Sequence, residues 1–284
     1  MKISIVIPVY NEEAAISSTL LTIKNTMAAV KGYDFEIIVV NDCSQDKTLS
    51  VLMEHEDIVI INNPYNLGYG ASLKRGISRA TGEWVYITDA DGTYPNDKLS
   101  QFLPYLKDYD MVVGARITKN NFTPAARRLP KKILNRFASF LADFKILDLN
   151  SGMRIFKKDK CLEFWNLYPQ RFSFTSTITM AFIKSNYLVK FVPIDYYERV
   201  GVSSIKPFDF FSFLGLIFRL NFYFQPLKFL VPASLFFLLI GAVKGSFDLF
   251  NQNYIGNFSI LFVILSLFIM LSAIFADLLF KQKR

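Results

Sequence analysis

Two aspartates separated by one residue, Asp89 and Asp91, are the side chains in this sequence best placed to do chemistry. They directly follow residues 83–88, which we interpret as a strand. Side chains alternate along a strand, so the two carboxylates share a face if the extended geometry continues. Oxygen ligands at this spacing suit Mg²⁺ or Mn²⁺, which completes its shell with water and substrate phosphates. A simple turn is the alternative, because Asp91-Gly92 and Pro95 are ordinary turn formers.

Apolar, β-branched runs alternate with helical patterns over the first 115 residues of the chain. Asn11, Glu12 and Glu13 are expected to cap the first helix and to place acids in its first turn. The alternation predicts an α/β fold with a mostly parallel sheet that helices cover on both faces. Strands are predicted at residues 2–9, 34–41, 58–62, 83–88 and 110–115, and helices at 11–30, 44–54 and 70–80.

Polar residues follow four of these predicted strands, at residues 10–12, Asp42, 89–91 and Arg116. In parallel sheets ligands bind beyond the carboxyl ends of the strands, so these residues are expected to meet at one edge. Their convergence favours a nucleotide-activated substrate. A glycine-bearing loop at residues 66–76 suits close approach of a phosphate, although it lacks the spacing of the dinucleotide-binding fingerprint and a plain turn is the alternative.

Two charge-poor runs near the C-terminus, at residues 229–243 and 258–280, predict two transmembrane helices. The first run is short, but Lys228 and Lys244 at its edges can snorkel and lengthen it. Most nearby Lys and Arg residues lie on one side, which predicts a multi-pass membrane protein with both termini cytoplasmic and residues 244–257 outside. The net charge of +8 then indicates an anionic lipid bilayer, rather than nucleic acid, as the partner.

The segments at residues 5–13, 39–48, 66–76 and 89–91 occur in the order seen in family 2 glycosyltransferases. Over about residues 1–205 the chain resembles the membrane-bound polyprenyl-phosphate branch of that family, which includes dolichol-phosphate mannose synthase. The resemblance implies a nucleotide-sugar-binding glycosyltransferase A fold and metal-dependent, inverting transfer of a sugar to polyprenyl phosphate. We expect a catalytic domain at 1–205, an interfacial amphipathic segment at 206–225 and a membrane domain at 226–284.

The resemblance also assigns the residues that would hold the nucleotide diphosphate sugar and its Mg²⁺ or Mn²⁺. Asp89 and Asp91 would bind the metal. Some relatives carry Gln where this chain has Thr93, so the role of Thr93 at the metal stays open. The donor would be bound by Pro8, Tyr10, Glu12, Asp42, Gly68, Asp89, Ala90 and Asp91.

Residues 111–142 contain seven basic residues and no acid, and the resemblance implies a mobile loop there that grips the lipid phosphate. Arginine suits this task because its planar fork meets two phosphate oxygens at once. The lipid-phosphate residues would be Arg116, Arg127, Arg128 and Arg199. Asp148 is either a base or a residue that orients Arg154 or the loop. The expected catalytic set is Asp91, Asp148, Arg116, Arg128 and Arg199.

Three alternatives stay open. A processive polysaccharide synthase is disfavoured because the Gln-x-x-Arg-Trp motif is absent and two membrane helices are few for a polymer channel. A non-catalytic protein that binds or helps translocate lipid-linked sugars, and a glycosyltransferase with another lipid or glycan acceptor, are the others. The sequence leaves the sugar, the nucleotide, the prenol length and a possible homo-oligomer undetermined.

Overall fold

The computed structural model of this chain describes residues 1–122, 125–170, 173–199, 215 and 222–282. The chain forms two compact units, Met1–Ile217 and Phe218–Arg284. The predicted interfacial segment, residues 206–225, lies outside the described residues except for Gly215 and residues 222–225. The predicted domain limits at 205 and 226 therefore stay predictions.

The N-terminal unit contains a seven-stranded sheet in the order β3-β2-β1-β4-β6-β5-β7. Only β6 runs antiparallel to its neighbours, β4 and β5, so the predicted mostly parallel sheet is confirmed. The strands are β1 Lys2–Val9, β2 Asp34–Asn41, β3 Val59–Asn62, β4 Trp84–Ile87, β5 Met111–Asn121, β6 Arg154–Lys157 and β7 Val189–Tyr196.

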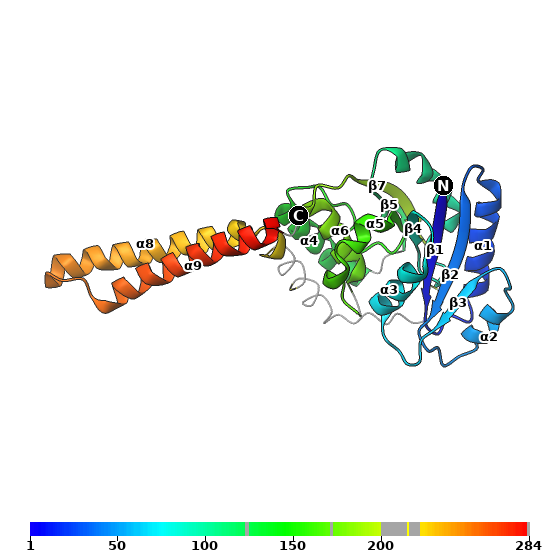
Figure 1. Cartoon of the computed structure of the whole chain (residues 1–284), viewed down its shortest axis with the longest axis horizontal. Helices are drawn as coiled ribbons and strands as arrows, with labels where there is room; N and C mark the ends of the chain where they lie inside the picture. The colour runs from blue at the N-terminus through cyan, green and yellow to red at the C-terminus, as the bar shows by residue number, and fades with distance from the viewer. Residues whose placement is uncertain (123–124, 171–172, 200–214, 216–221, 283–284) are drawn as a thin grey trace. The chain divides into compact units, whose positions relative to one another are not determined.

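Helices cover both faces of the sheet (Figure 1). Ile3, Ile5 and Ile7 of β1 pack in one buried cluster with α1 (Ile16–Ala29) and the 3-10 helix η1 (Asn96–Gln101). The opposite face carries α3 (Tyr69–Arg79), which approaches β1 and β2 closely. The other helices of this unit are α2 Thr48–Met53, η2 Leu103–Lys107, α4 Ala125–Ala142, α5 Lys158–Leu162, η3 Trp165–Leu167 and α6 Phe174–Lys184.

Pro8 lies inside β1, an interior strand of the sheet, although proline cannot donate to a strand ladder. The pairing of β1 with β4 ends at Val6 and Ile87, while Pro8 lies opposite Val40 of β2. The missing N–H therefore falls beyond the last residue of β1 that β4 pairs with. This explains why a proline is tolerated here.

Three predicted boundaries in this unit were wrong. The second helix begins at Thr48 rather than at residue 44. The first helix begins at Ile16 rather than at residue 11, and no side chain caps it, because Asn11 adopts a φ of 54° and turns the chain. The fifth strand continues to Asn121 rather than ending at 115, because β7 pairs with Arg116 and, after a register shift, again with Asn121. Arg116 consequently lies within β5 and not beyond its end.

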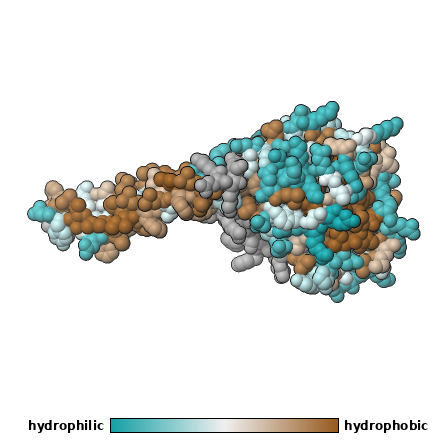
Figure 2. Space-filling model, viewed as in Figure 1, coloured by the Kyte–Doolittle hydropathy of each residue, from teal (hydrophilic) through white to brown (hydrophobic). Residues whose placement is uncertain are grey.

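The C-terminal unit is a hairpin of two long helices, α8 (Pro226–Gln252) and α9 (Asn257–Gln282). The apolar stretches Pro226–Asn251 and Asn257–Leu279 are each long enough to cross a membrane. Hydrophobic residues cover most of the visible surface of this unit (Figure 2). Ser234 Oγ donates to Ser266 O at 3.0 Å, which joins the two helices.

The connection between α8 and α9 is shorter than the predicted loop at 244–257. Lys244 lies inside α8, where it forms an ion pair with Asp248 one helical turn later. Asp248 also accepts hydrogen bonds from the Ser259 hydroxyl at 2.7 Å and from the Gly256 N–H at 3.2 Å. This aspartate ties the end of α8 to the start of α9.

Gly76 tests the packing of α3 on the sheet. A Cβ at this position would lie 2.3 Å from Val6 Cγ1 and 3.1 Å from Val40 Cγ2. We expect Gly76→Ala to lower the free energy of unfolding by about 1–3 kcal/mol, although alanine is the better helix former. The exposed Ser78→Ala on the same helix should stay within about 0.5 kcal/mol of wild type. Chemical denaturation of the detergent-solubilised chain measures both, and equal stabilities would contradict this packing.

Candidate active site

The turn after β1 is fixed by the turn after β2. The Glu12 N–H donates to Thr48 Oγ1 at 2.9 Å, and the Gln45 N–H donates to Asn11 Oδ1 at 2.7 Å. The Glu13 carboxylate in turn accepts the Lys47 N–H at 2.7 Å. These bonds set the direction in which Glu12 leaves the sheet edge, so the segment at 41–48 acts as a scaffold for it.

Asp42, at the end of β2, shapes the glycine-bearing loop. One carboxylate oxygen accepts the Asn63 amide at 2.6 Å and the Leu67 N–H at 2.9 Å, and the other accepts the Gly68 N–H at 2.8 Å. Gly68 has a φ of 97°, a backbone conformation that favours glycine. Both oxygens of Asp42 therefore bond groups that shape the loop, and its predicted contact with the nucleotide stays a prediction.

Asp89 lies two residues beyond β4 and is held from two sides. The Tyr69 hydroxyl, at the start of α3, donates to Asp89 Oδ1 at 3.0 Å. Gly152 packs against the other side, where a Cβ would lie 2.7 Å from Asp89 Oδ2. Burial and the negative charge of Asp91 raise the pKa of Asp89. Sequence reasoning did not single out Tyr69 or Gly152, although each lies in a segment that the family resemblance highlighted.

Asp91 is buried and its two oxygens have different partners. The Thr93 hydroxyl donates to Oδ1 at 2.6 Å, and the Thr93 N–H approaches the same oxygen at 3.2 Å. Arg199 Nε lies 3.5 Å from Oδ2. In this structure Thr93 orients Asp91, and the Arg199 guanidinium faces the other oxygen, Oδ2.

Glu12 joins this group through Arg199, whose Nη2 donates to Glu12 Oε1. Burial raises the pKa of Glu12 to about 7, and the charges of Asp91 and Asp89 add to the rise while Arg199 opposes it. Glu12, Asp89 and Asp91 thus form one electrostatically linked set, and we call these three residues the carboxylate cluster. The backbone between Asp89 and Asp91 is anchored to α1, because Thr19 Oγ1 donates to Ala90 O at 3.1 Å.

A second charged group surrounds Asp148, whose side chain is fully buried. Arg116 grips it with Nε at 2.7 Å and Nη2 at 2.9 Å, and Lys131 Nζ donates to it at 2.9 Å. Burial alone would raise the pKa of Asp148, but the attraction and hydrogen bonds of Arg116 and Lys131 lower it well below its usual range. Such a carboxylate is a poor proton acceptor at neutral pH. The contacts of Asp148 therefore favour a role in orienting Arg116 and α4 over a role as a base.

Arg154 donates its hydrogen bonds to groups other than Asp148. The structure therefore does not support the prediction that Asp148 orients Arg154. Its buried guanidinium donates instead to the carbonyl oxygens of Ser151 and Thr175 and to Thr179 Oγ1, at 3.0, 2.8 and 2.7 Å. Arg154 therefore braces the segment at 149–152 against α6. That segment carries Gly152, so Arg154 supports the wall of the Asp89 site.

Two tyrosines join the carboxylate cluster to the Asp148 group. The guanidinium carbon of Arg116 lies 5.0 Å from the centroid of the Tyr196 ring, and Tyr196 meets Tyr94 edge-on at 5.3 Å. The Tyr94 hydroxyl accepts the Gly152 N–H at 2.7 Å. The two tyrosines thus link Arg116 to Gly152, which packs against Asp89.

The other predicted site residues are less closely engaged. Tyr10 is exposed at the sheet edge, and Pro8 is buried in β1. Arg128 lies exposed on α4, whereas the side chain of Arg127 is outside the described structure. Much of the predicted basic acceptor loop is the helix α4, and it contains Pro130.

The carboxylate cluster suits a divalent cation by the chemistry of its donors. Among the described residues no group of three or more His, Cys, Asp or Glu side chains is arranged to hold a metal by itself. Asp89 and Asp91 instead offer a pair of hard oxygen donors, which Mg²⁺ or Mn²⁺ accepts when substrate phosphates and water supply the rest. Burial first, and then repulsion from Asp91, raise the pKa of Asp89, and a bound cation would offset both effects.

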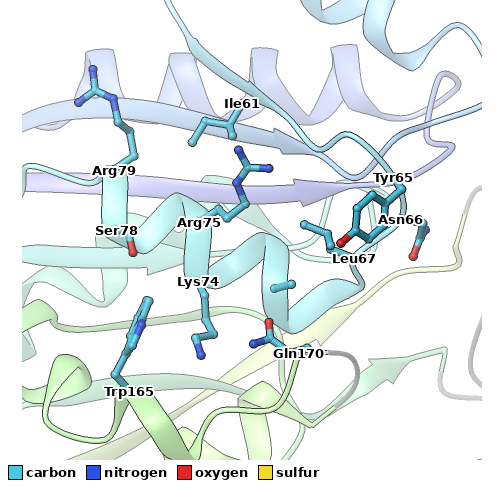
Figure 3. A pocket seen from close by; sticks show the side chains of 11 residues that line it. Ile61, Tyr65, Asn66, Leu67, Lys74, Arg75, Ser78, Arg79, Trp165 and Gln170 are labelled. Carbon is cyan, nitrogen blue, oxygen red and sulfur yellow. The ribbon is translucent and has the colours of Figure 1, made fainter.

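A separate cavity of about 930 Å³ lies beside α3 (Figure 3). Its lining includes Lys74, Arg75 and Arg79, and Lys74 Nζ lies 5.1 Å from the centroid of the Trp165 ring. None of the described residues that line it is acidic, so it offers no ligands for a divalent cation. It borders the surroundings of Asp42 at the loop near Leu67 and at Arg75, which donates to the Asn63 side chain.

The raised pKa of Glu12 predicts a specific pH dependence of stability. The folded state keeps a proton on Glu12 up to about pH 7, whereas the unfolded chain loses it near 4.5. Folding therefore becomes less favourable as pH rises through this window. We expect Glu12→Gln to flatten the fall in melting temperature between pH 5 and 7.5. Glu56→Gln, at an exposed position between α2 and β3, should keep the wild-type slope, and equal slopes in all three proteins would contradict the shift.

Comparisons with known proteins agree with this geometry. The model of the family described as Glycosyl transferase family 2 matches residues 4–165. The dolichyl-phosphate hexose transferase of Haloferax volcanii is 31% identical over 208 residues, which cover 72% of this chain and 87% of that protein. The low-salt glycan biosynthesis hexosyltransferase Agl6 of the same organism is 28% identical over 72% of this chain, which spans only 50% of that longer protein.

Among solved structures, glucosyl-3-phosphoglycerate synthase from Mycobacterium tuberculosis, in complex with Mn²⁺, uridine diphosphate and phosphoglyceric acid, superposes with a TM-score of 0.60. The match covers 78% of each chain at 17% identity, so it bears on the fold alone. The predicted glycosyltransferase A fold is confirmed. The family match, the sheet order and the carboxylate pair after β4 together show that this chain belongs to glycosyl transferase family 2.

Proposed function

We propose that this protein transfers a sugar from a nucleotide diphosphate sugar to the phosphate of a membrane polyprenol. The observation that carries the proposal is the presence of two charged groups in one unit. Arg199, just after β7, contacts the largely buried carboxylate cluster, and Arg116 of β5 grips Asp148 in the second group. A donor diphosphate needs a metal cation held by carboxylates, whereas an acceptor phosphate needs cationic side chains of the protein. The similarity to a dolichyl-phosphate hexose transferase supports this assignment.

On the donor side, Asp89 and Asp91 would hold Mg²⁺ or Mn²⁺, which when bound supplies positive charge to the departing nucleotide diphosphate. Tyr69 and Gly152 fix Asp89, and Thr93 fixes Asp91, so the pair needs little reorganisation when the donor arrives. The loop shaped by Asp42 would approach the nucleotide with backbone groups.

On the acceptor side, Arg116 and residues of α4 such as Arg128 would hold the lipid phosphate. A phosphate monoester has a second pKa near 6 and is largely ionised at neutral pH, so it can attack the anomeric carbon without a strong base. Positioning is therefore the main requirement. This fits the observation that Asp148 is committed to Arg116 and Lys131. A single displacement of this kind inverts the anomeric carbon.

The helical hairpin supplies the membrane location that a polyprenol acceptor requires. We infer that α8 and α9 cross the bilayer and that the N-terminal unit and both termini are cytoplasmic, because Lys and Arg gather at the ends that lead to the N-terminal unit and to the C-terminus. Lys244 lies at the opposite end of the hairpin. Because its charge is paired with Asp248, it weakens this asymmetry of positive charge little.

Loss of the Asp91 carboxylate tests the donor site. We expect Asp91→Asn to lower the rate of sugar transfer to polyprenyl phosphate by about 100-fold or more, because the cation that stabilises the leaving group loses a ligand. The exposed Asp108→Asn removes the same charge elsewhere and should keep wild-type activity. The measurement is lipid product formed by protein in proteoliposomes. Full activity of the Asp91 variant would contradict the proposed donor site.

Replacement of Asp148 separates a base from a positioning residue. We expect Asp148→Asn to raise KM for the lipid phosphate by roughly tenfold, because Arg116 loses a charged partner. The pH dependence of kcat should stay as in wild type, since no proton passes to Asp148. Steady-state kinetics between pH 6 and 8 check this. A loss confined to kcat together with an altered pH profile would restore the role of a base.

A further inference from the structure

Arg199 occupies an unusual position, because a residue expected to serve the acceptor phosphate lies instead in the donor site. Its Nη2 donates to Glu12 and its Nε lies 3.5 Å from Asp91 Oδ2. The side chain is only 29% exposed. Within the described part of the chain, the buried Nε atom has no hydrogen-bond partner. A buried donor of this kind is costly unless an acceptor arrives.

The arrangement conflicts with a loaded donor site. Thr93 occupies Asp91 Oδ1, which leaves Oδ2 as the oxygen most available to a divalent cation. Arg199 faces that same oxygen. A guanidinium and a dication beside one carboxylate oxygen repel each other strongly in a partly buried site. Binding of the cation therefore requires Arg199 to move away from Asp91.

We propose that Arg199 is a movable counter-cation that Glu12 holds in the donor site until the donor and its cation displace it towards the acceptor phosphate. This inference rests on the proposed function and deepens it. Glu12 is then a positioning residue for Arg199 as well as part of the donor pocket. The exchange couples the two substrates, because the guanidinium that leaves Asp91 becomes available to the lipid phosphate.

Such a coupling is reciprocal. If occupation of the donor site favours binding of the lipid phosphate through Arg199, the lipid phosphate favours the donor by the same factor. Weakening the hold of Glu12 on Arg199 should therefore tighten binding of the acceptor in the absence of donor. A residue that only lined the nucleotide pocket would have no such effect on the acceptor.

A double-mutant cycle on the full chain in detergent micelles tests this, with farnesyl phosphate as the probe and isothermal titration calorimetry as the measurement. Without donor or metal, we expect Glu12→Gln to bind farnesyl phosphate about fivefold more tightly than wild type. The same substitution should have no effect in an Arg199→Gln background, because it acts through that guanidinium. Glu56→Gln, which removes a carboxylate from an exposed position between α2 and β3, is the matched control and should bind as wild type does.

Each departure from this pattern contradicts a different statement. Unchanged or weaker binding by Glu12→Gln overturns the hold on Arg199 and leaves the proposed function standing. A gain that persists in the Arg199→Gln background is repulsion through space and also overturns the inference. Binding of farnesyl phosphate by none of the variants contradicts the proposed acceptor itself, and the inference falls with it.

A second measurement keeps the inference testable if Glu12→Gln does not fold. Mn²⁺ binding to the full chain without nucleotide, followed by electron paramagnetic resonance of the free ion, should be tighter in Arg199→Gln than in wild type by about fivefold. Lys98→Gln removes a cation that is paired with Asp195 and should leave Mn²⁺ binding unchanged. Equal or weaker Mn²⁺ binding by Arg199→Gln would overturn the competition for Asp91.

Discussion

The clustering of three largely buried carboxylates at one edge of the sheet is the constraint on which the rest of the site depends. Glu12 follows β1, and Asp89 and Asp91 follow β4; these strands are neighbours in the sheet, so the fold itself brings the three charges together. Buried like charges are costly unless hydrogen bonds and cations compensate them. Tyr69, Thr93 and Arg199 provide that compensation in the structure, and the arrangement remains suited to a divalent cation.

The second charged group, around Asp148, has the opposite balance of charge. Arg116 and Lys131 are cations in a partly buried setting, and Asp148 keeps them in place without neutralising the whole basic region. The tyrosine pair Tyr94 and Tyr196 links this group to Gly152, which packs against Asp89 of the carboxylate cluster. In our account the two groups divide the reaction, the carboxylates serving the donor and the basic residues serving the acceptor phosphate.

Much of this could be predicted from the sequence, because it depends on local pattern. The strand ending before Asp89 and the two apolar helices follow from periodicity, length and composition, and the family motif points to the carboxylate pair. What the sequence could not supply depends on contacts between distant segments. The bonds from Asp42 to Leu67 and Gly68, and from Tyr69 to Asp89, form only when the fold brings those loops together. The extension of β5 past residue 115 likewise needs β7, which pairs with it from far along the chain. The orientation of Asp148 towards Arg116, instead of Arg154, is decided by the same long-range packing.

The mass of the lipid formed by the wild-type protein tests the central claim most directly. Purified protein in proteoliposomes would be incubated with polyprenyl phosphate, Mn²⁺ or Mg²⁺ and a panel of nucleotide sugars, and the extracted lipid analysed by mass spectrometry. The account predicts a product heavier than polyprenyl phosphate by one glycosyl residue, with no added phosphate. A lipid that gains a sugar phosphate or a polymer, or an unchanged lipid with every donor, would contradict it.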